Sequence, residues 1–590
     1  MTSPSHIPST NAAAQESAAV EWERKPKHID ANLKHYDAVA KTFHWKDVER
    51  EFDWSKTGKV NVVHEAVDRH AASWRKNKVA LYFTDLERRD EKYTFQDLKL
   101  LTGRFGNVLK ALGVRRGDRV GVFLPRTPEL YIGILGMNRI GAIPVPLFEA
   151  FMEQAIQDRL ADSEAVACVT TPALKSRIPR QALPALKSLI LVGAEGKLSR
   201  DEIGYEEAMA EASDHLEPEW LAVDDGLIIH YTSGSTGKSK GALHRQYAMV
   251  GHYQTSKWAL DLRDDDTLWC TADPGWVTGT SYGIYGPWTL GVSSVVLGGR
   301  FDPDRWYQTI QKYRVTMWYS APTAYRRLMS AGEAIPKKYN LQSLRHICSV
   351  GEPLNPEALK WVKKITGLAP HETWWMTETG MQLICNYRSE DFKIGCTGKP
   401  FPGTYATVVG DQGEELPPGQ LGHLVVRPGW PSMMKEIWRN PAKYQEYFRI
   451  PGWYVSGDTA FKDADGFIWY QGRADDVIKT AGERVGPFEV ESALVAHPAV
   501  AEAGVIGKPD EVRGQIIKAF VALRKGSQPS EQLKQEIAEF VKTHLAAHAA
   551  PREIEFVERI PKTRSGKLMR RLLRAWDRGE PVGDISTMEE

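Results

Sequence analysis

From about residue 79 onward, short runs of β-branched and other apolar residues alternate with longer segments of helical period. The run VALYFTD, residues 79–85, is typical of a buried strand, and it is followed by TFQDLKLLTGRFGNVLKALG, residues 94–113. In that second segment Thr94 and Asp97 have the spacing of a capping box, apolar residues share one helical face, and Gly113 supplies a stop. The pattern therefore predicts a strand followed by a helix.

Similar units of strand, turn and helix recur four times further along the chain. They are DRVGVFLP (118–125), LIIHYTSGSTGK (227–238), SSVVLGG (293–299) and HICSVGEPLNPEALKWVKKI (346–365). Such alternation is typical of α/β domains with doubly wound sheets, whose ligands bind at the carboxyl ends of the strands. We therefore expect a large domain of this class.

The spacing changes after about residue 475. Three short apolar runs, AEAGVIG, QIIKAFVALR and EIEFVERI, accompany one amphipathic helix that carries Leu533, Ile537, Phe540, Val541 and Leu545. This pattern predicts a separate, small α+β domain. The expected division is a disordered leader at 1–20, an N-terminal extension packed on the large domain at 21–75, a large domain at 76–474 and a small domain at 475–590.

The length of 590 residues and a net charge of +1 bound the possible functions. A chain of this length is expected to form at least two domains, and no apolar run approaches the ~18 residues of a membrane span. The near-zero charge gives no global attraction to nucleic acid or anionic lipid. The five cysteines are scattered without metal-binding spacing. We expect a cytoplasmic protein with buried thiols and neither a nucleic-acid nor a membrane partner.

The stretch YTSGSTGKSKG, residues 231–241, combines glycines, small hydroxyl residues and two lysines directly after an apolar run. Glycines allow close backbone approach, and hydroxyl and ammonium groups suit a polyphosphate. A Walker A loop would require Gly at position 232, where this chain has Thr232. A P-loop NTPase or phosphotransferase and a flexible surface loop remain alternatives, although the position after a predicted buried strand favours a phosphate site.

Five further stretches follow this loop along the chain. They are GEP (351–353), TWWMTETG (373–380), GWYVSGD (452–458), GRADDVIKTAGERVGPFEVE (472–491) and PKTRSGK (561–567). Together they resemble the acyl-adenylate-forming superfamily, and within it the AMP-forming acetate–CoA ligases, which share GWVTG, SVGEP and WWMTETG. One departure is Ser239, where many relatives have proline between the two lysines.

The resemblance implies a binding site for ATP. The loop from Thr232 to Lys240 would hold the β- and γ-phosphates, Thr377 the α-phosphate and Glu378 a Mg²⁺ ion, and Asp458 would accept hydrogen bonds from both ribose hydroxyls. Adenine would lie between 351–353 and 372–376. The implied nucleotide contacts are Thr232, Ser233, Gly234, Ser235, Thr236, Gly237, Lys238, Gly351, Glu352, Pro353, Glu372, Thr373, Trp374, Trp375, Met376, Thr377, Asp458, Arg473 and Arg484.

By the same resemblance, an acyl pocket is walled by Val277, Thr278, Val350 and Trp375. The indole of Trp375 would stop the pocket after two or three carbons, since relatives that accept longer chains carry a small residue there. This predicts acetate as the preferred acid. One methylene changes binding in an apolar pocket by only about 1–3 kcal/mol, so some use of propionate is expected.

The remaining implied roles concern a second half-reaction with coenzyme A. Lys567 would bridge the carboxylate and α-phosphate during adenylation, and rotation of the small domain about a hinge at Asp475 would then withdraw it. Acetylation of Lys567 by a lysine acetyltransferase, reversed by a deacetylase, would be a means of control. The implied CoA contacts are Thr278, Ala481, Gly482, Arg177 and Arg180, and the implied ligands of a further metal are Val495, His497 and Val500.

The sequence thus predicts an enzyme that converts acetate and ATP to acetyl-AMP and pyrophosphate, and then transfers the acetyl group to CoA. A propionyl- or other short-chain acyl-CoA synthetase of the same fold is the nearest alternative. Two further alternatives are a phosphotransferase and a noncatalytic nucleotide-binding regulator; the joint presence of Lys567, Glu378 and Asp458 argues against the regulator.

Overall fold

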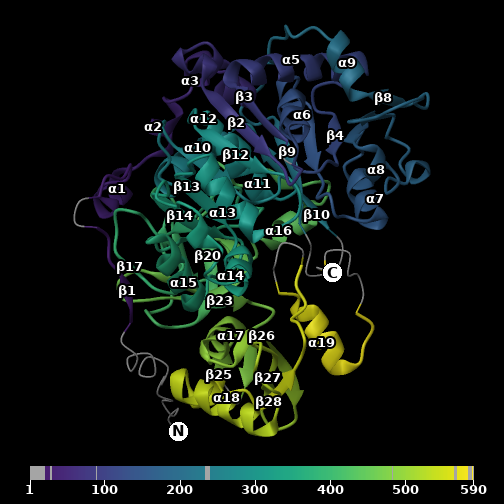
Figure 1. The fold of residues 1–590 in the computed structure, drawn as a ribbon. Helices are drawn as coiled ribbons and strands as arrows, with labels where there is room; N and C mark the ends of the chain where they lie inside the picture. Colours follow the sequence, from purple (N-terminus) through teal and green to yellow (C-terminus); the bar gives the residue numbers. More distant parts are fainter. Residues whose placement is uncertain are drawn as a thin grey trace, which may run out of the picture.

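The computed structural model describes residues 20–26, 29–87, 89–232, 239–480, 483–563, 568–582 and 588. Apart from Val20, the predicted leader lies outside these residues. Figure 1 shows a large N-terminal domain of several sheets and, below it, a small C-terminal α+β domain. The fold class expected from the sequence is therefore confirmed.

The centre of the large domain is a nine-stranded sheet. Its six neighbouring strands from β15 to β2 run parallel, and antiparallel strands complete both edges. In order across the sheet the strands are β18 (Lys399–Pro400), β16 (Ile384–Cys385), β15 (His371–Trp374), β14 (His346–Val350), β13 (Met317–Ser320), β11 (Thr267–Cys270), β12 (Ser293–Leu297), β2 (Val79–Thr84) and β3 (Asp90–Thr94).

A second sheet contains five parallel strands. They are β5 (Ile143–Pro146), β4 (Arg119–Val122), β6 (Ala167–Thr170), β7 (Ser188–Leu191) and β8 (Glu202–Gly204). Helix α5 (Phe95–Ala111) begins with the predicted capping box, in which the Asp97 amide donates to Thr94 Oγ1 at 3.1 Å and the Thr94 amide to Asp97 Oδ2 at 2.8 Å. The strand and helix predicted between residues 79 and 113 are both present.

The helices of the large domain follow the strands and cover the sheets (Figure 1). The longer ones are α6 (Pro128–Arg139), α7 (Glu153–Asp162), α10 (Ala248–Trp258), α13 (Pro303–Lys312), α14 (Pro322–Ala331) and α15 (Pro356–Thr366). The short ones are α1 (Tyr36–Thr42), α2 (Trp45–Glu49), α3 (Trp54–Thr57), α4 (Arg69–Ala71), α8 (Pro172–Lys175), α9 (Tyr205–Glu211), α11 (Val277–Thr280), α12 (Gly286–Thr289) and α16 (Pro441–Glu446). No helix among the described ranges has the length and apolar composition needed to cross a membrane.

The segment around the glycine-rich loop departs from the prediction. Strand β9 (Gly226–Thr232) pairs antiparallel with β10 (Lys240–Arg245), with Thr232 opposite Lys240, and β10 also pairs with β21 (Glu436–Ile437). The predicted strand, turn and helix unit at 227–238 is therefore wrong. The reason is that the four buried residues Gly241–His244 extend a second strand directly after the loop. Among the described residues, a strand follows the loop, so residues 239–245 offer no helix dipole for phosphate binding.

Two smaller sheets complete the large domain. One is antiparallel and contains β19 (Ala406–Val409), β20 (Gly422–Val426), β22 (Tyr454–Lys462) and β23 (Ile468–Arg473). The other joins the N-terminal strand β1 (Trp22–Glu23) to β17 (Phe392–Lys393). Strands β22 and β23 place Asp458 opposite Arg473.

The C-terminal domain is a five-stranded sheet with helices. Its elements are β24 (Ile478–Thr480), β25 (Glu483–Val485), α17 (Pro487–Ala496), β26 (Val500–Asp510), β27 (Gly514–Leu523), α18 (Glu531–His544), β28 (Glu553–Phe556) and α19 (Arg570–Arg578). The three predicted strands and the predicted amphipathic helix correspond to β26, β27, β28 and α18. Ile537 and Val541 of α18 are fully buried in the core of this domain.

Candidate active site

The turn after β14 and the strand β15 form one wall of the candidate site. Gly351 has a φ of +92°, and a Cβ there would meet no atom within 4 Å, so this backbone is open to a ligand. Across from it, Glu372 Oε1 accepts a hydrogen bond from the Leu354 amide at 2.5 Å. The segment 372–376 is therefore joined to the residue that directly follows 351–353.

The carboxylate of Glu352 is turned away from this wall toward α14. It accepts a hydrogen bond from the Thr323 amide at 2.8 Å and pairs with Arg326 at 2.6 Å. The side chain of Glu352 is thus used to hold its own turn in place. What residues 351–353 can offer a purine is their backbone.

Glu372 is a buried acid with an unusual protonation equilibrium. Burial raises the pKa of Glu372 to about 8, the Glu352 carboxylate adds to this rise, and the Leu354 amide opposes it. The carboxyl group is consequently largely protonated at neutral pH. The neighbouring Thr373 donates to the Ser349 carbonyl at 2.7 Å, which fixes β15 to β14.

Asp458, Arg473 and Trp374 come together although they are far apart in sequence. Asp458 is buried, its Oδ1 lies 3.0 Å from Arg473 Nη1, and its Oδ2 accepts a hydrogen bond from Trp374 Nε1 at 2.9 Å. The predicted ribose acid is therefore next to a predicted cationic contact and to the segment predicted to contact adenine.

Glu378 lies in the turn after β15, where it meets Lys240 at the end of the glycine-rich loop. Its Oε1 is 3.2 Å from Lys240 Nζ and accepts a hydrogen bond from the Tyr447 hydroxyl at 2.6 Å. Burial alone would raise the pKa of Glu378, but the Lys240 charge and the Tyr447 hydroxyl outweigh it and leave the pKa below its ordinary value. Glu378 is therefore ionised at neutral pH, as a ligand of a divalent cation must be.

Tyr447 was not identified from the sequence, because the stretch YQEYF carries no motif that separates it from a core aromatic residue. It also accepts a short hydrogen bond from Lys240 Nζ, whose ammonium lies 4.7 Å from the centre of the Tyr447 ring. The ring of Tyr447 stacks on that of Tyr454 at 5.4 Å.

Trp375, Val277 and Val350, three of the residues predicted to wall an acyl pocket, share one buried apolar cluster. The pocket itself stays a prediction. The cluster also contains Tyr282, which meets the Trp375 indole edge to face at 5.1 Å, and Tyr319, whose hydroxyl accepts from Trp375 Nε1 at 3.2 Å. These two tyrosines were not predicted. They fix the orientation of the indole, while Thr278, partly exposed, lies beside Val277 at the start of α11.

The two arginines predicted to contact CoA already have partners. Arg177 donates to the Glu149 carbonyl at 2.9 Å and to the Phe151 carbonyl at 3.3 Å, and the Phe151 ring lies 5.9 Å from that of Trp276, directly before Val277. Arg180 forms a short ion pair with Asp201. These contacts lead from Arg177 through Phe151 to Trp276, the residue before Val277. The CoA roles of both arginines stay predictions.

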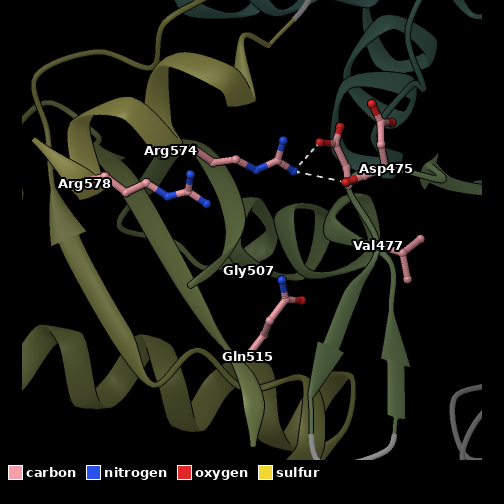
Figure 2. A pocket seen from close by; sticks show the side chains of 7 residues that line it. Asp475, Val477, Gly507, Gln515, Arg574 and Arg578 are labelled. Carbon is pink, nitrogen blue, oxygen red and sulfur yellow. Dashed lines mark hydrogen bonds and ion pairs between the residues drawn. The ribbon is translucent and has the colours of Figure 1, made fainter. Parts of the chain in front are cut away.

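The predicted hinge, Asp475, lies at the edge of a cavity of about 360 Å³ between the domains' connecting segment and α19 (Figure 2). Arg574 of α19 donates to the Asp475 carbonyl at 3.5 Å and to Asp476 Oδ1 at 2.5 Å. On the other side, the Asp475 carboxylate is 3.8 Å from Arg473 Nε. Ion pairs thus run from the predicted ribose acid through Arg473 to this segment.

The predicted metal ligands Val495, His497 and Val500 lie between the end of α17 and the start of β26, and their role stays a prediction. The Nδ1 atom of His497 accepts a hydrogen bond from the Ala499 amide at 3.2 Å, and the Val500 carbonyl accepts one from the Arg524 guanidinium at 2.9 Å. Among the described residues, no three His, Cys, Asp or Glu side chains form a group that could hold a metal ion.

Several predicted residues lie outside the described ranges: Ser233, Gly234, Ser235, Thr236, Gly237, Lys238, Ala481, Gly482 and Lys567. For Arg484 only the backbone is described; it lies in β25 opposite Lys479. Thr377 and Met376 are partly exposed beside Glu378. The roles of all these residues stay predictions.

The fold and the site define a class of protein. Residues 67–438 match the family of AMP-binding enzymes, and residues 489–567 match the AMP-binding enzyme C-terminal domain. The chain belongs to this family. Within it, the chain is similar to acetyl-coenzyme A synthetases: one from Bacillus subtilis (strain 168) is 58% identical over 95% of this chain and 98% of its own length. Another, from Methanothrix thermoacetophila, is 44% identical over 91% of this chain and 86% of its own length.

Solved structures agree with this assignment. The crystal structure of a Brucella canis acyl-CoA synthetase is 36% identical, with a TM-score of 0.73 over 93% of this chain and 99% of that one. The crystal structure of an anthranilate CoA ligase in complex with anthranoyl-AMP is 30% identical, with a TM-score of 0.81 over 88% of this chain and 98% of that one. The resemblance inferred from the motifs is confirmed.

Proposed function

We propose that this protein is an AMP-forming acetate–CoA ligase. An oxygen of the acetate carboxylate attacks the α-phosphorus of ATP, the bond to the β-phosphate breaks, and acetyl-AMP and pyrophosphate form. The CoA thiol, which loses its proton, then attacks the acetyl carbon, and the C–O bond to AMP breaks. Membership of the family implies the use of ATP and CoA, and the acetyl-coenzyme A synthetase from Bacillus subtilis supports acetate as the acid.

The observation that carries the acetate assignment is the closed environment of Trp375. Its indole is buried against Val277 and Val350 and is held by Tyr282 and Tyr319. A ring fixed from two sides cannot swing aside at low cost, since rearranging a packed core costs about 1–3 kcal/mol. The pocket is therefore expected to end after two or three carbons.

In the first half-reaction, Asp458 binds the ribose hydroxyls, the backbone of 351–353 faces adenine and Lys567 bridges the two reacting anions. Fixed positive charge is what suppresses the repulsion between carboxylate and phosphate. The ionised, buried carboxylate of Glu378 fits a Mg²⁺ ligand, and the ion would neutralise phosphate charge when bound. In the second half-reaction the C-terminal domain turns about Asp475, Lys567 leaves, and Ala481 and Gly482 line the path of the CoA thiol.

Two further inferences rest on this assignment. A cytoplasmic location accords with the substrates ATP and CoA. Acetylation of Lys567 would remove the charge that adenylation needs and would spare the thioester step.

The test is a product assay with ATP, Mg²⁺, acetate and CoA. We expect AMP and pyrophosphate, formed only when acetate is present. A P-loop phosphotransferase would instead release ADP, and the Thr232 departure together with the strand that follows the loop argues against one. Formation of ADP would refute the proposed function.

A further inference from the structure

Three segments of the proposed nucleotide site meet at one residue, Tyr447, which follows α16. Its hydroxyl donates to Glu378 at 2.6 Å and accepts from Lys240. Its backbone carbonyl accepts a hydrogen bond from the Val455 amide of β22 at 2.7 Å, and β22 also carries Asp458. Tyr447 thereby connects the glycine-rich loop, the turn with Glu378 and the strand with the ribose acid.

The hydroxyl of Tyr447 is not explained by packing. The ring stacks on Tyr454 in an apolar cluster, where phenylalanine would fill the same volume. The oxygen, in contrast, has one donor and two acceptor sites, and it uses the donor for a carboxylate and an acceptor site for an ammonium. Hydrogen bonds to charged groups are roughly twice as strong as hydrogen bonds between neutral groups.

We infer that Tyr447 is a positioning residue for the adenylation half-reaction. It holds the Glu378 carboxylate and the Lys240 ammonium at one edge of the site, so that both face the triphosphate of an incoming nucleotide. A divalent cation that binds Glu378 competes with Lys240, which lies 3.2 Å from the same oxygen, and the Tyr447 hydroxyl is the contact that keeps the carboxylate in place during this exchange. The inference rests on the proposed function in one respect, the assignment of Glu378 to the metal.

The test compares Tyr447→Phe with Tyr454→Phe. The second variant is a matched control. It removes from the stacked partner ring a hydroxyl that donates to the thioether of Met376 at 3.7 Å and not to Glu378. Two half-reactions are measured separately: acetate-dependent exchange of pyrophosphate into ATP, and formation of acetyl-CoA from preformed acetyl-AMP and CoA. Binding of ATP with and without Mg²⁺ is measured by calorimetry, and folding by the midpoint of thermal unfolding.

For Tyr447→Phe we expect adenylation to fall about 10–100-fold, the usual effect of losing a contact that orients a metal ligand. The Mg²⁺ concentration needed for half-maximal ATP binding should rise, whereas the thioester step should stay within about two-fold. Tyr454→Phe should change none of these. Equal losses in both half-reactions would show a structural role only, and unchanged adenylation and Mg²⁺ dependence would also overturn the inference.

A second variant, Lys240→Met, tests the same Glu378 oxygen without altering Tyr447. In Lys240→Met the ammonium is absent, and the Mg²⁺ dependence of ATP binding should weaken because the competing cation is gone. In the double variant the two effects should not add, since both residues act on the same oxygen. Strict additivity would contradict the inference. Wild-type protein that binds ATP with Mg²⁺ but forms no AMP would refute the proposed function, and the calorimetric comparison would still decide the role of Tyr447.

Discussion

The guanidinium of Arg473 lies 3.0 Å from the carboxylate of Asp458, its neighbour across strands β22 and β23. Because Asp458 also accepts a hydrogen bond from Trp374 Nε1, its two oxygens are oriented before any nucleotide arrives. A carboxylate held in this way can accept from two vicinal hydroxyls without further ordering. The arrangement makes Asp458 the anchor of the proposed ribose site.

Asp458→Asn should therefore weaken ATP binding about 10–100-fold, since one charge-assisted hydrogen bond contributes about 1.5–3 kcal/mol. Calorimetry with ATP gives the dissociation constant directly. Asp465→Asn, at the exposed turn between the same two strands, is the matched control and should leave it unchanged. If the two variants bind ATP equally well, the ribose does not bind at Asp458.

Trp375→Gly should lengthen the preferred acid. Removing the indole opens the end of the cluster formed with Val277 and Val350, so butyrate and longer acids gain turnover relative to acetate. The change also costs about 3–5 kcal/mol of stability, as large-to-small core substitutions do, so folding is checked by thermal unfolding. A folded variant with an unchanged acid profile would show that another side chain limits the pocket.

The raised pKa of Glu372 should make the stability of the protein depend on pH. Its pKa in the folded protein, about 8, lies above the ordinary value of 4.5, so the folded state holds a proton that the unfolded state has lost between these pH values. The contribution of this group is full below pH 4.5 and falls as pH rises toward 8, by at most about 1.4 kcal/mol per pH unit.

Thermal unfolding between pH 6 and pH 9 checks this expectation. The wild-type protein should lose stability relative to Glu372→Gln, which keeps the size of the side chain and cannot ionise. Parallel curves for the two proteins would mean that Glu372 does not titrate in this range.

Lys567→Ala should separate the two half-reactions. Without the ammonium, acetate-dependent pyrophosphate exchange should fall by several orders of magnitude, because nothing then bridges the two anions. Formation of acetyl-CoA from preformed acetyl-AMP should be largely retained. If both half-reactions fall equally, the division of labour between two domain orientations is wrong.

The elements that the sequence predicted are those with a local signature. Helix α5 is marked by its capping residues, and β26 to β28 by short apolar runs. The hairpin β9–β10 was missed because the sequence of a glycine-rich loop is similar whether a strand or a helix follows it. Only the pairing of Thr232 with Lys240, a contact across the loop, distinguishes the two.

The candidate site could be proposed from the sequence where its residues stand in motifs, and the roles of these residues stay predictions. Glu378, Asp458 and Trp375 all lie in quoted stretches, and the structure gives each the buried, polar or apolar surroundings that its proposed role needs. Tyr447, Tyr282 and Tyr319 were not predictable, because each reaches the site through a contact between distant segments. Such contacts depend on tertiary packing, which leaves no periodic signal in the sequence.

The most direct test of the central claim is the rate of AMP formation across acids of two to six carbons, with ATP, Mg²⁺ and CoA held constant. The account predicts acetate as the best substrate, propionate slower and butyrate close to background, because the fixed indole of Trp375 ends the pocket. Turnover of butyrate equal to or greater than that of acetate would contradict it.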